Sequence, residues 1–346
     1  MIDRGINSMH TYNEIMGQAD QLQRTYELVT KLEIQHEAVD QVLFTGCGTS
    51  FYLAASAAKY YQTVTGQFAS ALPASEFFLH TSTVIVPGKK YLVIAISRSG
   101  TTSEILIALN HLKGNTNIRT LAVTCNGDTP MAETGDQVIA LDHISEKSVV
   151  MTQSFSNMLF ALEVFTAKQA NSSQNLDELK LVPELVGRVL SSGELIENVA
   201  EDLTKKRFIF LGSGSYNGLA KEATLKLKEM TQAECESYSS MEFRHGPISI
   251  VDNSTVVVLL TQRETVDYDQ QLVKDIQRLS GYVVAIGPVP TGFEADKVIE
   301  LTNEISDMNR HSIYVPYLQL LAYQRAMKLG FDPDKPRNLT QVVTLS

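Results

Sequence analysis

Seven consecutive residues rich in hydroxyl groups, Ser97-Arg-Ser-Gly-Thr-Thr-Ser103, separate an apolar stretch from a helical pattern. The first residues of a helix offer unpaired backbone N–H groups and the positive end of the helix dipole, which together favour an anion. The hydroxyls of Ser97, Ser99 and Thr102 would add donors, and Gly100 would let the backbone approach a ligand closely. We therefore predict that this hydroxyl loop, residues 97–102, binds a phosphate group.

Serine and threonine also cap helices without binding any ligand, and for an isolated loop that explanation would be favoured. A second segment, Gly48-Thr49-Ser50, changes the balance because it also follows an apolar strand. In an open parallel sheet both segments would lie at the carboxyl ends of strands, where ligands bind, so Ser50 becomes a further phosphate donor. The dinucleotide fingerprint does not fit, since Gly46-Cys-Gly48 lacks its third glycine, and no P-loop pattern is present.

Three charged residues on a predicted helix, Glu222, Lys226 and Glu229, are spaced by four and three positions and share one helix face. Charges at this spacing usually form a solvated face. His245, which stands before a Gly-Pro turn, favours another interpretation because histidine titrates near neutral pH. A glutamate base and a histidine acid suit aldose–ketose isomerisation, in which one group opens the sugar ring and the other moves a proton between C1 and C2.

Apolar strands alternate with helical patterns along the chain, which is typical of parallel, doubly wound sheets covered by helices. Three segments of the first half have a counterpart in the second half, in the same order. They are Val42 to Ser50 with Phe208 to Ser215, Tyr91 to Ile96 with Val256 to Leu260, and Asp136 to Leu141 with Asp296 to Leu301. We therefore predict an α/β protein with two tandem flavodoxin-like subdomains, derived from a duplicated unit.

The elements around these halves define the expected domain limits. A long amphipathic helix is predicted from Tyr12 to His36, a polar linker from Gln169 to Asn175, and a last helix from Tyr314 to Leu329, closed by Gly330 in a left-handed cap. We expect three parts: an N-terminal helix with the first subdomain and the phosphate site (residues 1–168), a second subdomain with the acid–base residues (185–330), and an extended C-terminal tail (331–346).

Composition narrows the class of protein. The chain has 346 residues, enough for two domains, and a net charge of −10 that argues against nucleic acid or an anionic membrane as partner. No apolar run could span a bilayer, and the N-terminus lacks the apolar core of a secretion signal, so a cytoplasmic protein is expected. Cys47, Cys125 and Cys235 have no metal-like spacing and are predicted to be reduced thiols; no metal or other cofactor is expected.

Taken together, the hydroxyl loop, residues 46–50 and residues 226–245 resemble the sugar isomerase (SIS) superfamily, over nearly the whole chain. Met151-Thr-Gln-Ser-Phe155 and residues 210–247 resemble the galactosamine-6-phosphate deaminase/ketose–aldose isomerases. Pro336-Arg-Asn-Leu339 and residues 225–229 are similar to the isomerase half of glucosamine-6-phosphate synthase, and Glu242-Phe-Arg-His-Gly-Pro247 also resembles the fructosamine-6-phosphate deglycases.

The resemblance to the synthase implies a role for each matching residue. Ser50, Ser97, Ser99 and Thr102 would hold the phosphate of a phosphosugar. Glu229 would move the proton between C1 and C2, and Lys226 would lie near the sugar hydroxyls. His245 would assist ring opening from the neighbouring subunit of a homodimer, so that the active site is shared.

Two residues at the expected sugar-phosphate site depart from the synthase pattern. Arg98 stands where the synthase has glutamine between its phosphate-binding serines, and Gln341 stands where it has a Schiff-base lysine. We expect no amidotransferase domain ahead of the two halves, because Ile2 occupies the place of the cysteine nucleophile. We therefore expect release of ammonia or an amine, in the catabolic direction, rather than glutamine-dependent synthesis.

Three functions remain open at this point. The first is an isomerase/deaminase of an amino-sugar (hexosamine) 6-phosphate, and the second is a fructosamine-6-phosphate deglycase. The third is a non-catalytic phosphosugar sensor. The presence of both Glu229 and His245 favours an enzyme, and the segment before Val42 is too short and too acidic for the DNA-binding domain that such sensors often carry.

Overall fold

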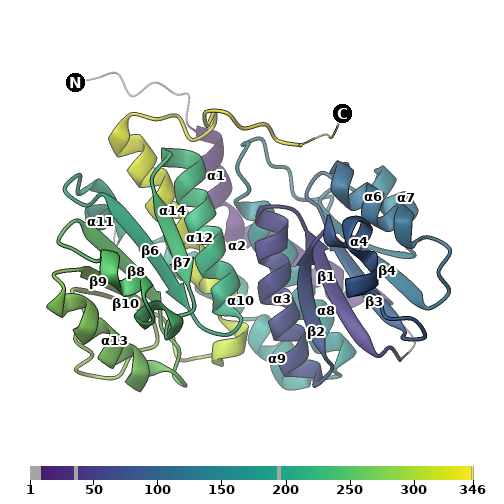
Figure 1. Cartoon of the computed structure of the whole chain (residues 1–346), viewed down its shortest axis with the longest axis horizontal. Helices are drawn as coiled ribbons and strands as arrows, with labels where there is room; N and C mark the ends of the chain where they lie inside the picture. Colours follow the sequence, from purple (N-terminus) through teal and green to yellow (C-terminus); the bar gives the residue numbers. More distant parts are fainter. Residues whose placement is uncertain (1–8, 35–37, 193–195, 344, 346) are drawn as a thin grey trace. The chain divides into compact units, whose positions relative to one another are not determined.

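The computed structural model describes residues 9–34, 38–192, 196–343 and 345 (Figure 1). The chain divides into two compact units, which we call after their sheets. The first-sheet unit contains residues 17–147, 151–183 and 340–346. The second-sheet unit contains residues 1–16, 148–150 and 184–339.

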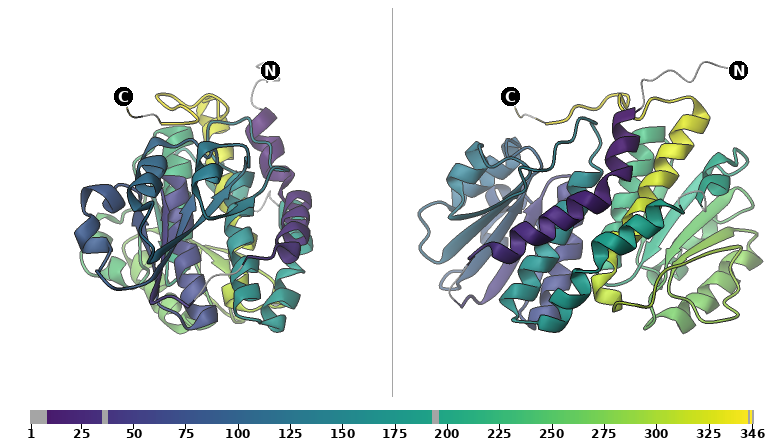
Figure 2. Two further views of the ribbon diagram at one scale, coloured as in Figure 1. Left: turned by 90° about the vertical axis from the view of Figure 1, so that its right-hand side faces the viewer. Right: turned by 180° about the vertical axis from the view of Figure 1, so that it is seen from behind.

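The first-sheet unit is a parallel five-stranded sheet with the order β2-β1-β3-β4-β5. Its helices α3 and α8 pack together on one face of the sheet, and α2 packs on the outside of α8 (Figure 2). The short helices α4 to α7 cover the other face. The elements in chain order are α2 (Gln18–Lys31), β1 (Gln41–Gly46), α3 (Thr49–Thr65), β2 (Ala69–Pro73), α4 (Glu76–Leu79), α5 (Thr81–Val84), β3 (Tyr91–Ile96), α6 (Ser103–Leu112), β4 (Ile118–Thr124), α7 (Pro130–Thr134), β5 (Gln137–Ala140), α8 (Gln153–Gln169) and α9 (Ser173–Leu179).

The second-sheet unit repeats this plan with the order β10-β9-β8-β6-β7, again with all neighbours parallel. Helix α12 packs against α14 on one face, and α13 lies on the other. The elements are α1 (Met9–Met16), α10 (Val182–Leu190, of which the first two residues belong to the first-sheet unit), α11 (Glu197–Glu201), β6 (Arg207–Gly212), α12 (Tyr216–Thr231), β7 (Cys235–Tyr238), η3 (Glu242–Arg244), η4 (Pro247–Ile250), β8 (Thr255–Leu260), α13 (Val266–Arg278), β9 (Tyr282–Gly287), β10 (Lys297–Glu300), η5 (Asp307–Asn309) and α14 (His311–Leu329).

Read in chain order, each sheet places its second strand at one edge, its first strand next, and then its third, fourth and fifth strands. This is the flavodoxin-like order, and it confirms the predicted pair of doubly wound α/β subdomains. The same close contact between a strand and its following helix occurs within each half. A side chain at Gly46 or Gly212 would collide with the backbone of the following helix, so each strand can pass directly into its helix.

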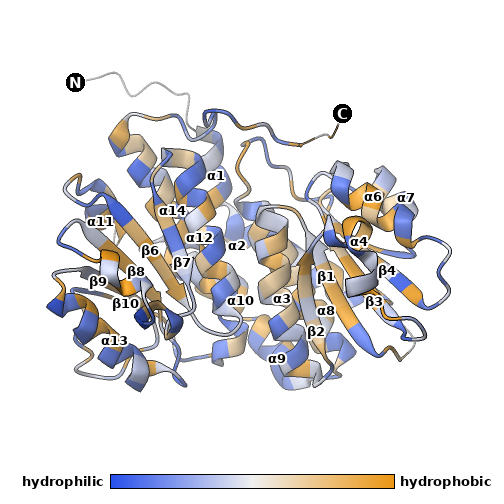
Figure 3. Cartoon of the chain, in the orientation of Figure 1, coloured by the Kyte–Doolittle hydropathy of each residue, from blue (hydrophilic) through white to orange (hydrophobic). Residues whose placement is uncertain are grey.

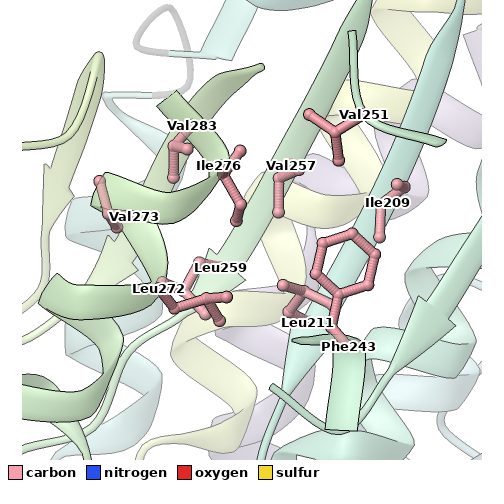
Figure 4. Close-up of a cluster of buried hydrophobic side chains, with 10 residues drawn as sticks. All are labelled: Ile209, Leu211, Phe243, Val251, Val257, Leu259, Leu272, Val273, Ile276 and Val283. Atoms are coloured by element: carbon pink, nitrogen blue, oxygen red, sulfur yellow. The ribbon is translucent and has the colours of Figure 1, made fainter. Parts of the chain in front are cut away.

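Continuous burial explains why these segments form central parallel strands. Every residue of β3 and of β8 is buried, as expected for strands covered by helices on both faces. In the second-sheet unit, β6, β8 and α13 join their apolar side chains into one cluster with Phe243 (Figure 4). Colouring by hydropathy shows the same apolar strands between more polar helix surfaces (Figure 3).

Two expectations about helices and linkers are corrected by the structure. The predicted helix from Tyr12 to His36 is two helices, α1 and α2, which meet at Gly17. Glycine is a poor helix former because it gives up the most backbone freedom, and the chain turns extended at Leu32. His36 lies outside the described residues.

The predicted linker 169–175 is the turn between α8 and α9, inside the first-sheet unit. Its polar residues cap a helix instead, since the Ser172 hydroxyl accepts a hydrogen bond from the Asn175 N–H. The chain passes to the second-sheet unit after Pro183. The last helix ends at Leu329, and Gly330 adopts the predicted left-handed conformation.

Candidate active site

The hydroxyl loop connects β3 to α6 and folds upon itself. Ser97 is buried, and its Oγ lies 2.9 Å from Thr102 Oγ1 while accepting a hydrogen bond from the Gly100 N–H at 3.2 Å. Ser99 Oγ accepts hydrogen bonds from both the backbone N–H and the hydroxyl of Thr101. The loop therefore gathers four hydroxyls before the first turn of a ten-residue helix, as the sequence predicted.

Gly100 is the residue that allows this compact turn. Its φ angle is +65°, a conformation that favours glycine, and a Cβ atom there would collide with the Thr129 side chain. The Gly100 carbonyl also accepts a hydrogen bond from the Met131 N–H at 3.2 Å, at the start of α7. A larger residue would push the loop away from the end of β4 and open the cluster of hydroxyls.

Ser50 lies in the first turn of α3, after the neighbouring strand β1, and is buried. Strands β1 and β3 are adjacent and parallel, so Ser50 and the hydroxyl loop follow the carboxyl ends of two paired strands. The Ser50 hydroxyl is 4.0 Å from the Met151 sulfur, which is a weak acceptor. The structure thus confirms the predicted edge of the sheet for both groups.

Arg98 does not extend freely from the hydroxyl loop. Its guanidinium forms an ion pair with Glu146 at 2.8 Å and donates to the Gln341 carbonyl at 3.1 Å. Glu146 also accepts hydrogen bonds from the backbone N–H groups of Thr152 and Ser154 at the start of α8. Arg98 therefore links the hydroxyl loop to both α8 and the C-terminal tail.

Gln341, the second departure from the synthase pattern, contacts Arg98 through its backbone carbonyl. Its own side chain is turned to Lys147, whose carbonyl accepts a hydrogen bond from Gln341 Nε2 at 2.8 Å. Leu345, farther along the tail, donates its backbone N–H to the Ser103 hydroxyl at 3.1 Å. The tail thus touches both ends of the hydroxyl loop within the first-sheet unit.

Two of the three charged residues singled out on α12, Glu222 and Lys226, are buried, and Glu229 is partly buried, so the stripe is not a solvated face. Lys226 is only 1% exposed, and its ammonium forms a short ion pair with Glu229 and a longer one, 3.4 Å, with Glu222. The Glu229 side chain retains 18% of its exposure, the largest of the three. A buried cation held by two carboxylates is an arrangement expected of chemistry rather than of solubility.

Helix α12 is fixed by its apolar stripe, which positions these charges. Leu219, Ala223, Leu227 and Met230 are all buried at helical spacing, and the helix ends where Gln232 turns left-handed. Helix α14 packs along α12. The charged stripe next to the apolar one is therefore carried into the interior with it.

His245 lies in the turn between η3 and η4 and is exposed. Its backbone N–H bonds to the Glu242 carbonyl at 3.0 Å, and Gly246 has a φ angle of +119° before Pro247. Within the described part of the chain, no hydrogen bond or ion pair joins the His245 ring to Lys226 or Glu229. The structure thus joins Lys226 to Glu229 but leaves His245 apart from them.

A family model for the SIS domain matches residues 37–168 and 203–326, one stretch over each sheet. The chain belongs to the SIS domain family. Among curated proteins, this SIS chain is 31% identical to a glutamine–fructose-6-phosphate aminotransferase (isomerizing) of Methanococcus maripaludis, over 92% of this chain and 54% of that protein. The protein of the same name from Sulfurisphaera tokodaii is 30% identical to this chain, over 94% of this chain and 54% of that protein. The chain spans about half the length of the curated relatives it matches.

Two solved structures resemble the SIS chain over almost its full length. A glucosamine-6-phosphate deaminase from Thermotoga maritima has a TM-score of 0.81 and 29% identity, covering 97% of this chain and 100% of that one. The C-terminal domain of glucosamine-fructose-6-phosphate aminotransferase from Francisella tularensis has a TM-score of 0.85 and 26% identity, with coverage of 97% and 100%.

Sequence reasoning about this SIS chain missed Glu146, although a clue was available. Glu146 follows the carboxyl end of β5, on the same sheet edge as the hydroxyl loop, and precedes the start of α8. Its side chain is only 2% exposed, so its charge is stabilised by Arg98 and the donors of α8. The signal in the sequence is an acidic residue that follows a predicted strand at the same sheet edge as the hydroxyls.

Two cysteines lie at this edge without offering a nucleophile. Burial raises the pKa of the Cys47 thiol to about 12, with a smaller contribution from Glu104. Burial also raises the pKa of the Cys125 thiol, and the neighbouring Glu146 adds to the effect. Both remain protonated thiols at neutral pH. Among the described residues there is no cluster of potential metal ligands and no helix long and apolar enough to cross a membrane.

Proposed function

We propose that this SIS protein is a phosphosugar aldose–ketose isomerase/deaminase that acts on an amino-sugar (hexosamine) 6-phosphate. The observation that carries the proposal is the ion pair on α12 between the buried Lys226 and the partly exposed Glu229. A protein that only senses a phosphosugar needs the hydroxyl loop but has no use for a carboxylate–ammonium pair in its interior. The names of the relatives, which include an aminotransferase and a glucosamine-6-phosphate deaminase, support the same class of substrate.

In this proposal the hydroxyl loop and Ser50 hold the phosphate. The Ser97 and Thr102 hydroxyls now hydrogen-bond to each other, and Ser99 Oγ accepts from Thr101. Phosphate oxygens would accept hydrogens from the Ser97, Ser99 and Thr102 hydroxyls in place of these bonds. Local donors are essential because the net charge of −10 repels an anion. Arg98 and Gln341 would act at the same site by holding the tail beside the loop.

Glu229 is the proposed base. It would take the proton from C2 of the open-chain amino sugar and return it to C1, converting the C1 aldehyde and C2 amine into a C1 alcohol and a C2 imine. Water then replaces the nitrogen at C2, which releases ammonia and leaves a ketose phosphate. The Lys226 ammonium, which forms an ion pair with Glu229, would stabilise the carboxylate form that this step needs.

His245 is the proposed acid–base group for ring opening, and it would serve the active site of a second copy of the chain. Its exposure in the second-sheet unit agrees with such a role. We infer a homodimer with shared active sites that works in the cytoplasm, where the three unpaired cysteines would stay reduced.

A second candidate is a fructosamine-6-phosphate deglycase, favoured by the segment from Glu242 to Pro247, which resembles those enzymes. Both candidates use proton transfer at C1 and C2 and differ in the leaving amine. A panel of hexosamine and fructosamine 6-phosphates, scored for ammonia, free amine and ketose phosphate, separates them. We expect ammonia from a hexosamine 6-phosphate. Tight binding of these compounds without turnover of any would instead identify a sensor.

A further inference from the structure

Glu222 is a buried carboxylate for which the proposed reaction has no role so far. Glu222 lies one helical turn before Lys226 on α12 and is only 3% exposed. Its Oε1 is 3.4 Å from the Lys226 ammonium, and along the helix Glu222 precedes Lys226 whereas the more exposed Glu229 follows it. One buried ammonium therefore stands between two carboxylates of unequal exposure.

The charges of this cluster change during proton transfer. With all three groups ionised, the two carboxylates and one ammonium sum to a single negative charge. When Glu229 accepts a proton it loses its charge, and Lys226 would then be a buried cation without that partner. A buried charge that loses its only counter-ion is strongly destabilised. Glu222 keeps an anion next to Lys226 at that moment, so the cluster becomes neutral rather than positive.

Other titratable groups on the elements packed against α12 bond to partners of their own. On α14, His311 bonds to Ser215, Tyr314 to the Thr261 carbonyl and Tyr317 to Ser192. Arg325 bonds to the carbonyls of Ala200, Asp202 and Lys205, Lys328 bonds to Glu201, and the Tyr323 ring packs against Tyr12. On β6 and β7, Arg207 bonds to the Ile250 carbonyl, Cys235 to the Thr224 carbonyl and Tyr238 to Glu236. Glu222 is the second carboxylate that forms an ion pair with Lys226.

We propose that Glu222 is a positioning residue, which holds Lys226 charged and in place while Glu229 gains and loses the substrate proton. The inference rests on the proposed function. Glu222 and Glu229 share the charge of one ammonium, so Glu222 both supports Lys226 and limits the effect of Lys226 on the proposed base.

The test replaces Glu222 by glutamine, which keeps the shape of the side chain and removes its charge. In Glu222→Gln the full Lys226 charge acts on Glu229, so the acidic limb of the kcat–pH profile should move down by about one pH unit. We expect kcat to fall about tenfold or more while KM changes little. Glu222→Asp keeps the charge and should return the limb toward its original pH. Glu163→Gln, which removes a buried carboxylate of α8, should leave the limb in place.

A second readout needs no turnover. Carbon-13 NMR of protein labelled at glutamate carboxyls follows the titration of Glu229, assigned by its loss in Glu229→Gln. Glu222→Gln should lower the Glu229 midpoint even if no substrate in the panel reacts, so a failed function and a failed inference give different results. An unchanged midpoint and an unchanged acidic limb in a folded Glu222→Gln protein would overturn the proposal. A loss of activity with both unchanged would show that Glu222 is only structural. If Glu222→Gln does not fold, Glu222→Asp must still shift the midpoint slightly downward, because its carboxylate is farther from Lys226.

Discussion

The two sheets share one strand order but differ at the same edge. After β3, the loop of residues 97–102 is built from hydroxyls around Gly100, which is left-handed. After β8, the corresponding loop carries Arg263, whose guanidinium bonds to both the side chain and the carbonyl of Asn303. The Arg263 N–H donates to Asp307 at 2.8 Å. The loop after β3 thus groups hydroxyls together, whereas the donors of Arg263 in the loop after β8 bond to Asn303 and Asp307 of the same unit.

The helices that follow the first strand of each sheet, α3 and α12, also differ, and here the charged residues belong to the second-sheet unit. Counted from Gly46 and Gly212, Glu222 and Lys226 of α12 correspond to Ser56 and Tyr60 of α3, and these are buried but uncharged at neutral pH. Under the proposed function, the first-sheet unit would supply the anion-binding groups and the second-sheet unit the acid–base groups. The two units share their strand order and their glycine contacts, and they differ in the side chains that stand at corresponding positions.

The largest expected difference between the two units follows from removing the proposed base, Glu229, from α12. In Glu229→Gln we expect turnover to fall by roughly two to four orders of magnitude, the usual share of a general base, while phosphosugar binding survives. Wild-type protein in deuterated water should exchange the C1 or C2 hydrogen of its substrate, and the variant should not. Glu234→Gln, an exposed change just after the helix, is the matched control. Near-normal turnover in Glu229→Gln would remove this residue from the mechanism.

Removing one hydroxyl from the first sheet should weaken binding rather than chemistry. Ser99→Ala should cost about 1–3 kcal/mol of sugar-phosphate binding, because a charged acceptor loses a donor. Arg263→Ala, at the corresponding place after β8, should leave the affinity unchanged and so sharpens the contrast between the sheets. Calorimetric titration measures both. Equal affinities for wild type and Ser99→Ala would place the phosphate elsewhere.

Mixing two inactive proteins tests whether copies of the chain share their chemistry. If His245 serves the partner subunit, a heterodimer of Glu229→Gln and His245→Ala chains contains one site with both residues intact. We expect partial recovery of activity after subunit exchange, up to about a quarter of the wild-type value if exchange is random and one of four sites is intact. Exchange must be verified with differently labelled chains. Activity that stays at the level of the separate variants would indicate that His245 acts elsewhere.

Sequence pattern predicted the strands and the sheet edge well because both depend on local rules. Apolar runs such as those of β3 and β8 need burial on both faces, and glycine at residues 46, 100 and 212 marks backbone that tolerates no larger residue. The break at Gly17 was missed because the apolar pattern continues through it, and a periodic pattern does not register one residue of poor helix propensity.

Burial and long-range pairing could not be predicted in the same way. The stripe of Glu222, Lys226 and Glu229 has the spacing of a solvated face, and only the packing of α12 shows that it is internal. The pairing of Arg98 with Glu146 joins residues from different loops, for which spacing contains no information. The sequence identified Gln341 by its place in the tail. Only the structure shows that the backbone carbonyl of Gln341 accepts a hydrogen bond from Arg98.

The last expected effect concerns stability rather than activity, at a third point where the two sheets differ. The fourth residue of α6 is Leu106, whereas the fourth residue of α13 is Asp269, which is buried. Burial raises the pKa of Asp269 to about 6, although the hydroxyl of Thr265 and a backbone N–H bond to its carboxylate. The folded protein therefore binds this proton more tightly than the unfolded chain, whose aspartate has a pKa near 3.8.

Stability linked to Asp269 should fall as the pH rises between those two values, and the loss should be complete above about pH 6, because ionisation places a charge in the interior. Asp269→Asn keeps an oxygen that accepts from Thr265 but cannot ionise. Relative to wild type it should gain about 1–3 kcal/mol of unfolding free energy between pH 4 and pH 7, measured by denaturant titration at several pH values. Asp267→Asn, an exposed change on the same turn, should follow wild type throughout. Parallel stability curves for wild type and Asp269→Asn would mean that the buried carboxylate ionises without penalty, and that its hydrogen bonds outweigh the cost of its burial.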